Sequence, residues 1–281
     1  MNTRAIKEIV RRYNLAISPR RMGQNFLVDP RMLARIAATV EATAGDIVLE
    51  IGAGLGALTG ELLQSGATVY AVERDARFVR VLTDRFREAA NLQMVRSDIL
   101  RLDLGSYAMG EPKRILVAGN IPFSMTSPIL EFLLHQRRWV RRVVLTVQKE
   151  VALRIIAEPG TKEYASITLL TQIAFRPKIA FTIPPNAFYP QPKVTSAVMC
   201  LEPLSEPVVP PEEEEGVLRL VRMLFTHRRK TLLNALSFSG KAEDRSILRG
   251  ALEKAGLDPI RRPDTLGFGE LLKLRRALPA R

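Results

Sequence analysis

The four residues Asn120-Ile121-Pro122-Phe123 follow an apolar run at 115–119 and carry the most informative chemical pattern in this chain. An Asn-x-Pro-aromatic turn at the end of a strand offers an amide oxygen, a backbone carbonyl and a flat apolar ring to one small planar group. Such a set suits a planar amine, because its two N–H groups need acceptors and its face needs a stacking partner. The pattern therefore predicts a site for an aromatic amine.

The chemistry that this turn could support is attack by the amine as a nucleophile. An aromatic amine is a poor nucleophile because its lone pair is delocalised into the ring. If the Asn120 side-chain oxygen and the Ile121 carbonyl each accept one N–H, the nitrogen moves toward tetrahedral geometry and its lone pair is freed. Pro122 fixes the turn, and Phe123 would stack on the base, which is worth about 1–3 kcal/mol at other base–aromatic contacts. A surface turn with a core phenylalanine is the alternative interpretation.

A glycine-rich segment, Glu50-Ile-Gly-Ala-Gly-Leu-Gly56, closes another apolar run upstream. Glycines at a strand-to-helix turn let a ligand approach the backbone, because no Cβ stands in the way. The spacing is G-x-G-x-G rather than the dinucleotide fingerprint G-x-G-x-x-G, which disfavours an NAD enzyme. We predict that Gly52 and Gly54 contact a nucleotide-like cofactor. A tight turn without a ligand is the alternative.

Two carboxylates follow the next two apolar runs. Glu73 lies 21 residues after Gly52 and could accept both ribose hydroxyls of an adenosine-type ligand. Asp98 could accept the exocyclic amine of the cofactor's adenine. In open α/β sheets, ligands bind at the carboxyl ends of the strands, where all these residues would lie. With Asn120, which is 68 positions after Gly52, they predict methyl transfer from S-adenosylmethionine to an amine.

The first 200 residues alternate β-rich runs with helical patterns, which is typical of a parallel sheet with helices on both faces. Predicted strands are 47–51, 68–72, 92–96, 115–119 and 142–147, an antiparallel edge pair is predicted at 178–182 and 196–201, and predicted helices are 55–65, 76–89 and 127–135. The stretch 204–216, rich in proline and acid, predicts a linker. It separates a catalytic domain at 1–203, with a basic N-terminal segment, from a small helical domain at 217–281, with helices at 217–225, 230–236, 246–255 and 269–278.

The net charge of +13 is unevenly distributed. Residues 216–281 hold 15 Lys and Arg against 6 Asp and Glu, a net charge of +9, whereas residues 1–215 hold 27 against 23, a net of +4. A basic module on a nearly balanced body suits a polyanionic partner. Solvated basic faces are the alternative; an acidic membrane surface is a weaker one, because no amphipathic helix anchored by Trp or Phe is evident.

The composition of the chain also disfavours several classes of protein. No apolar run approaches the roughly 18 residues that a membrane span needs, and the N-terminus has no signal-peptide core. The single cysteine, Cys200, rules out an internal disulfide framework and favours the reducing cytoplasm. With only His135 and His227 beside that cysteine, a metal site is not expected.

The chain resembles the ribosomal RNA adenine dimethyltransferases over nearly its whole length. The matching blocks, beyond the cofactor loop and the Asn120 turn, are Gly23-Gln-Asn-Phe-Leu27, Gln148-Lys-Glu150, Pro185-Asn-Ala-Phe188, Pro192-Lys-Val194 with Ser196-Ala197-Val198, and Phe225 with Arg228-Arg-Lys-Thr231 and Asn234. The resemblance implies a Rossmann-like class I methyltransferase with a mostly parallel seven-stranded sheet and a small helical C-terminal domain. It also implies dimethylation of two adjacent adenines in small-subunit ribosomal RNA, in the biogenesis of that subunit.

The resemblance also assigns residues. Asn25 and Leu27 would join the cofactor site, with Gly52, Gly54, Glu73, Asp98 and Asn120, while Arg228, Arg229 and Lys230 would face RNA. The chain departs from the family at three positions: Phe123 replaces the usual tyrosine, Ser124 a common asparagine and Ala53 a frequent proline. Loss of the hydroxyl keeps the stacking face of residue 123, so we expect activity to survive.

Two other interpretations stay open. An antibiotic-resistance type that modifies large-subunit RNA shares the cofactor loop and the turn; Gln148-Lys-Glu150 and the Arg228 block favour the small-subunit type. A ribosome-assembly or transcription factor could keep the fold without needing catalysis, but intact Glu73, Asp98 and Asn120 argue against loss of the cofactor. We expect a cytoplasmic monomer that acts on a pre-ribosomal small subunit.

Overall fold

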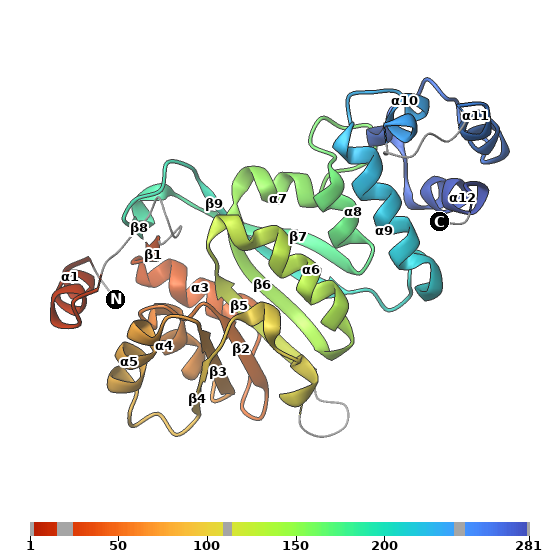
Figure 1. Ribbon diagram of the computed structural model, residues 1–281. Helices are drawn as coiled ribbons and strands as arrows, with labels where there is room; N and C mark the ends of the chain where they lie inside the picture. Colours follow the sequence, from red (N-terminus) through yellow and green to blue (C-terminus); the bar gives the residue numbers. More distant parts are fainter. Residues whose placement is uncertain (1–2, 16–24, 109–113, 239–244, 280–281) are drawn as a thin grey trace. The chain divides into compact units, whose positions relative to one another are not determined.

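The computed structural model describes residues 3–15, 25–108, 114–238 and 245–279. These residues form two compact units (Figure 1): unit 1 comprises Met1–Ala152 and Arg176–Pro203, and unit 2 comprises Leu153–Phe175 and Leu204–Arg281. The segment 153–175, which the sequence places in the catalytic domain, thus belongs to the helical unit. Each unit is described separately below.

A seven-stranded sheet forms the centre of unit 1, in the order β4-β3-β2-β5-β6-β9-β7. The strands are β2 (Ile47–Ile51), β3 (Thr68–Glu73), β4 (Leu92–Arg96), β5 (Ile115–Asn120), β6 (Val140–Gln148), β7 (Phe175–Ile183) and β9 (Ser196–Pro203). The neighbours from β4 to β6 pair in parallel, and β9 runs antiparallel to β6. The predicted mostly parallel seven-stranded sheet is therefore confirmed.

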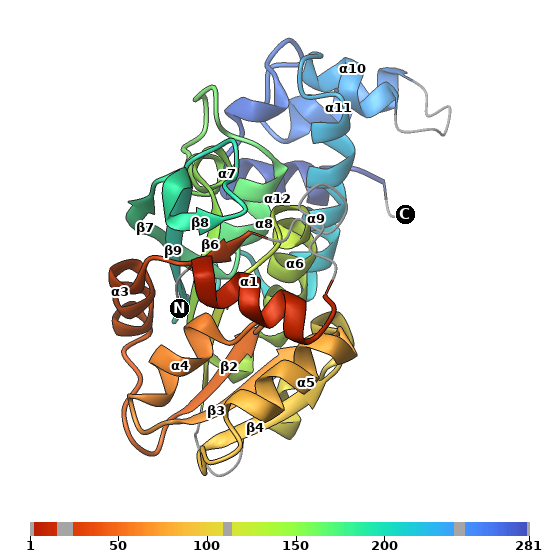
Figure 2. The same ribbon diagram turned by 90° about the vertical axis from the view of Figure 1, so that its left-hand side faces the viewer.

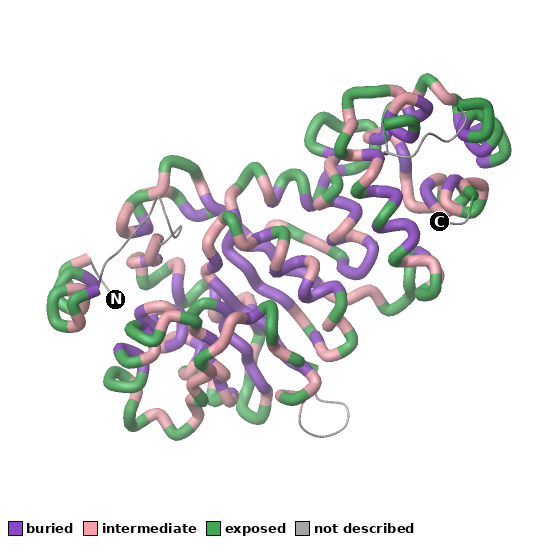
Figure 3. Tube along the Cα trace, viewed as in Figure 1, coloured by how far each residue is buried: buried purple, intermediate pink, exposed green. Residues whose placement is uncertain are grey.

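Strands β2 and β5 are buried along nearly their whole length, which shows that both faces of the sheet are covered (Figure 3). Leu116 and Ala118 of β5 share one apolar core with α3 (Pro30–Val40) and α4 (Ala57–Leu63). The alternate residues Ile115 and Val117 point to the opposite face and are also fully buried. Helix α6 (Thr126–Gln136) crosses that face in front of the sheet (Figure 1).

The N-terminal helix α1 (Thr3–Arg12) packs beside the glycine-rich loop and is seen in front of α4 and α5 in Figure 2. Its buried Ile6 shares a small apolar cluster with Leu55 of that loop and with Phe78 of α5 (Ala76–Arg85). A two-stranded antiparallel sheet, β1 (Phe26–Leu27) with β8 (Phe188–Tyr189), lies next to this cluster. The N-terminal segment thus covers one side of the loop.

Unit 2 is helical, as the sequence predicts, but α9 and α10 begin at other residues than predicted. They are α8 (Ser166–Gln172), α9 (Pro211–Thr226), α10 (Leu232–Ser237), α11 (Arg245–Lys254) and α12 (Phe268–Ala277), and α7 (Lys149–Ile155) spans the division between the units. The linker predicted at 204–216 is shorter in the structure and ends at Pro210. Helix α9 begins early because proline at the first helical position and acidic residues in the first turn stabilise a helix N-terminus. The helix predicted at 230–236 begins at Leu232, with Thr231 as its N-cap.

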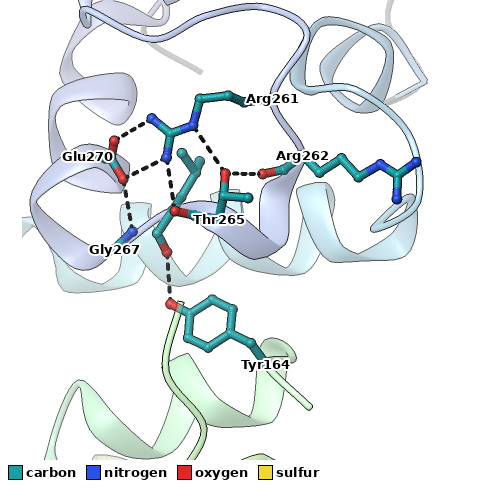
Figure 4. Close-up of polar contacts among 7 residues, drawn as sticks. Tyr164, Arg261, Arg262, Thr265, Gly267 and Glu270 are labelled. Carbon is teal, nitrogen blue, oxygen red and sulfur yellow. Dashed lines mark hydrogen bonds and ion pairs between the residues drawn. The ribbon is translucent and has the colours of Figure 1, made fainter. Parts of the chain in front are cut away.

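A polar network explains why the segment 153–175 belongs to unit 2 (Figure 4). The buried Tyr164 hydroxyl donates to the carbonyl of Leu266 at 2.8 Å, linking residues 102 positions apart. Around that carbonyl, Arg261 pairs with Glu270 at 2.6 Å and also donates to Thr265, so the chain between α11 and α12 is fixed. No local pattern in 153–175 predicts such a contact.

Tyr164→Phe should lower the stability of unit 2. The substitution removes one hydroxyl and leaves the Leu266 carbonyl without this donor, which costs about 1–3 kcal/mol for a buried group. Urea denaturation with a probe in the C-terminal helices would measure the change. Tyr107→Phe is the matched control, because the partly buried Tyr107 hydroxyl has no hydrogen bond to any described residue. Equal stability of the two variants would contradict this role of Tyr164.

Candidate active site

One cavity of about 300 Å³ lies in unit 1 at the carboxyl ends of β2 to β5. Because these strands are parallel and in register, their C-terminal residues share one sheet edge. The predicted site residues that line the cavity are Asn25, Leu27, Gly52, Gly54, Glu73, Asp98, Asn120, Ile121, Pro122 and Phe123. The first two residues of the Gly23 motif lie outside the described part of the chain.

The glycines of the loop have two separate functions. Gly52 and Gly54 adopt positive φ values of 71° and 54°, which favour glycine, and a Cβ added at Gly52 would meet no atom within 4 Å. The backbone there borders open space, as close approach by a ligand requires. At Gly56, in contrast, an added Cβ would lie 2.5 Å from Phe86 and 2.7 Å from Leu82, so this glycine serves packing against α5.

Glu73 is anchored by the backbone on both carboxylate oxygens. One oxygen accepts the N–H of Gly54 at 3.0 Å and the other accepts the N–H of Asp75 at 2.8 Å. Burial raises the pKa of Glu73 above its usual value, and these N–H groups oppose that shift. Each oxygen keeps a lone pair, so the carboxylate can still accept hydroxyl groups from a ligand. The side chain therefore also holds the glycine-rich loop in place.

Asp98 stands at the next strand end and caps a short 3₁₀ turn. One carboxylate oxygen accepts the N–H of Leu100 at 3.1 Å, and the other lies 3.5 Å from the guanidinium of Arg74. Because Arg74 is largely exposed, this ion pair contributes little stability. Asp98 is thus held at the edge of the cavity with acceptor capacity to spare.

The Asn120 side chain is oriented by a contact with the N-terminal segment. Its amide nitrogen donates to the backbone carbonyl of Asn25 at 3.1 Å, across 95 positions of sequence. The amide oxygen accepts no hydrogen bond from any described residue, so it keeps its full acceptor capacity in this part of the chain. Pro122 has φ −57° and ψ 133°, after which a 3₁₀ turn (Phe123–Met125) begins, with the Phe123 carbonyl accepting from Thr126 at 3.0 Å.

Two residues beyond the predicted set also shape the site. Glu50, which begins the glycine-rich segment, lines the cavity although only 2% of it is exposed, and it accepts the hydroxyl of Thr59 at 2.6 Å. An acidic residue directly before such a loop is a signal that sequence alone provides. Arg85 of α5 donates to the carbonyl of Leu55 in the loop, and burial lowers the pKa of Arg85. No local motif marks Arg85.

Glu50 gives the protein a specific dependence on pH. Burial raises its pKa from 4.5 to about 7, the hydrogen bond from Thr59 opposes this shift, and the nearby Glu73 carboxylate adds to it. Between these values the unfolded chain loses the proton and the folded chain keeps it. The free energy of unfolding therefore falls as the pH rises from 4.5 to about 7 and then levels off.

Glu50→Gln should remove this part of the pH dependence. Relative to the variant, the unliganded wild-type protein should lose about 3 kcal/mol of stability across that window, from the size of the shift. Denaturation at several pH values measures the difference, and the exposed Glu88→Gln in the same unit is the control. A difference between wild type and Glu50→Gln that stays constant with pH would refute a buried, protonated Glu50.

The basic triplet Arg228, Arg229 and Lys230 lies in unit 2, in the turn between α9 and α10 rather than at the start of a helix. Arg228 is turned inward: it pairs with Asp264 at 3.2 Å and donates to the carbonyl of Lys162 at 2.6 Å. Arg229 and Lys230 are exposed. That all three residues contact RNA stays a prediction; within unit 2 the Arg228 guanidinium already binds Asp264 and the Lys162 carbonyl.

The described residues contain no group of three or more His, Cys, Asp and Glu side chains that could hold a metal ion. None of the helices they form is both long enough and apolar enough to cross a membrane.

The sheet order, the glycine-rich loop after β2, the carboxylates after β3 and β4 and the Asn-x-Pro-Phe turn after β5 define a Rossmann-like class I methyltransferase. The model of the family described as ribosomal RNA adenine dimethylase matches residues 18–272, and the chain belongs to this family of enzymes.

Named relatives agree with this assignment. The chain is 39% identical over 274 residues to "Ribosomal RNA small subunit methyltransferase A" of Clostridium botulinum, covering 98% of this chain and 97% of that protein. It is 41% identical over 262 residues to the protein of the same name from Geobacter metallireducens, covering 92% and 94%.

Solved structures agree in fold. A dimethyladenosine transferase from Plasmodium falciparum superposes with a TM-score of 0.70 at 23% identity, covering 89% of this chain and 95% of that one. The 23S rRNA methyltransferase ErmE superposes with a TM-score of 0.64 at 27% identity, covering 90% and 99%.

Proposed function

We propose that this protein uses S-adenosylmethionine to dimethylate the exocyclic amines of two adjacent adenines in small-subunit ribosomal RNA, during assembly of that subunit in the cytoplasm. The observation that carries the proposal is the orientation of Asn120. Its amide nitrogen is held by the Asn25 carbonyl, and its oxygen is the group left to accept an N–H in the cavity. Relatives about 40% identical over nearly the whole chain bear the small-subunit name.

The residues that line the cavity suit S-adenosylmethionine. Gly52 leaves space at the backbone, Gly54 lines the same cavity, and Glu73 and Asp98 offer carboxylate oxygens at neighbouring strand ends for ribose and adenine. Asn25 and Leu27 would complete that side of the site. When bound, the cofactor supplies an electrophilic methyl group. The carboxylates near the cavity also suit a cationic ligand, because opposite charges attract most strongly where water is excluded.

The protein's own part in the reaction is to position and activate the amine. The Asn120 oxygen and the Ile121 carbonyl would accept the two N–H bonds of adenine, which localises the lone pair on nitrogen. Methylation makes this nitrogen cationic until a proton leaves, and the same two oxygens stabilise that charge. Pro122 fixes the spacing of the acceptors, and Phe123 would stack on the base.

The activity is tested with labelled S-adenosylmethionine and small ribosomal subunits that lack the adenine methyl groups, followed by mapping of the modified bases. We expect two dimethylated adjacent adenines in small-subunit RNA. Large subunits and their RNA form the second arm, because ErmE, named for 23S RNA, shares the fold at 27% identity. Methylation only in the second arm would assign the large-subunit activity instead.

Glu73→Gln should weaken binding of S-adenosylmethionine. The variant removes the charge, and charge-assisted hydrogen bonds to ribose contribute about 1.5–3 kcal/mol, which is roughly a 10- to 150-fold change in Kd. Calorimetry measures the affinity, with Glu88→Gln as the exposed control. An unchanged Kd would remove Glu73 from the ribose site.

Asn120→Ala should abolish methyl transfer while cofactor affinity changes little, because the amide oxygen would act mainly in the transition state. Phe123→Tyr should stay active and Phe123→Ala should not, since stacking is the proposed contribution. Single-turnover rates and calorimetry separate the two effects. Normal turnover by Phe123→Ala would mean that the base is held elsewhere.

A further inference from the structure

An exposed aromatic pair lies next to the turn of unit 2 that carries Arg228, Arg229 and Lys230, called the basic turn below. Phe238, at the C-terminal end of α10, is 59% exposed, and its ring centroid lies 4.9 Å from that of His227 with an interplanar angle of 37°. His227 is the residue at which α9 ends, directly before Arg228. Helix ends that are 11 positions apart in sequence thus place two flat rings against each other at the surface.

Hydrogen bonds hold the basic turn beside these rings. The backbone N–H of Lys230 donates to the carbonyl of His227 at 2.8 Å, which closes the turn. The Arg228 side chain holds the turn in place through its ion pair with Asp264 and its hydrogen bond to the Lys162 carbonyl. Arg229 and Lys230 are left exposed on the same short turn as His227. Two cations and an open aromatic face are therefore presented together.

This combination differs from an ordinary exposed apolar residue. Ile247 and Ile260 of the same unit are 51% and 74% exposed, but neither offers a flat π face. Sites for unpaired nucleic acid combine aromatic side chains, on which bases stack, with cations that contact the neighbouring phosphates. Nucleic acid matches both features at once, because its flat bases lie next to a repeating row of phosphates, which favours a polyanion.

We propose that Phe238, backed by His227, is a stacking platform for one unpaired base of the RNA substrate, with Arg229 and Lys230 contacting the phosphates beside that base. The proposal rests on the proposed function, because it takes the partner to be ribosomal RNA. It assigns to unit 2 a contact with a base face in addition to phosphate contacts. Stacking tolerates any base, so the platform adds affinity rather than sequence specificity.

Four single variants of the full-length protein, Phe238→Ala, Phe238→Leu, Phe238→Trp and Ile247→Ala, separate stacking from apolar contact. Binding to unmethylated small subunits at several salt concentrations is the first measurement. Phe238→Ala and Phe238→Leu should both weaken binding about 5- to 150-fold, from the usual contribution of one stacked base. Phe238→Trp and the control Ile247→Ala should bind like the wild type. The Phe238 variants should leave the salt slope unchanged, whereas Arg229→Ala with Lys230→Ala should flatten it.

Fluorescence gives a direct test of the stack. The wild-type protein has a single tryptophan, Trp139, and serves as the blank. A short single-stranded oligoribonucleotide should quench the added emission of Phe238→Trp, and a duplex of the same length should not. If Phe238→Leu binds like the wild type, or if the added tryptophan is not quenched, the platform is overturned.

The two proposals fail separately. Methylation of small subunits by the wild type, with neither loss of binding nor quenching in the Phe238 variants, would overturn the platform alone. The opposite result is quenching in Phe238→Trp and weakened binding by Phe238→Ala and Phe238→Leu, without methylation of small subunits by the wild type. That result would support the platform and overturn the proposed function.

Discussion

The parallel register of β2, β3, β4 and β5 is the constraint on which the site depends. Parallel strands that end at one edge bring together groups that are far apart in sequence, and here they align a glycine loop, two carboxylates and an amide around one cavity. The central strands β2 and β5 are buried on both faces, so the apolar core on either side of the sheet holds them in place. The precision of the site thus comes from the core beneath it.

Burial has a second effect at this edge, because it raises the energy of negative charge. Glu50 and Glu73 both have raised pKa values, and in each case burial is the largest cause. Backbone N–H groups partly offset this at Glu73, and Thr59 does so at Glu50. A cationic ligand would favour ionisation of both groups.

The helical unit uses its positive charge in two different ways. Arg228 forms an ion pair with Asp264, and Arg261 forms one with Glu270. Both ion pairs stabilise loops between helices. Arg229 and Lys230 stay at the surface beside the exposed ring of Phe238. Net charge by itself does not separate these two uses, because both kinds of arginine contribute equally to the total. Only the position of the acidic partners does.

Local patterns in the chain predict the sheet, the cavity loop and the order of the strand-end residues, because apolar periodicity and glycine spacing are local signals. They also place Glu73, Asp98 and Asn120 at one edge, since strand ends in parallel sheets coincide. Composition does not locate every helix boundary: the acidic run after Pro211 resembles a linker in composition yet forms a helix N-terminus.

Which atoms of these residues face the cavity depends on contacts between distant elements. The Asn25 carbonyl orients the Asn120 amide across 95 positions, and Tyr164 ties the segment 153–175 to Leu266 across 102. The inward turn of Arg228 and the pairing of His227 with Phe238 are likewise contacts between separate elements. Contacts between residues so far apart depend on the packing of whole elements, which no local pattern encodes.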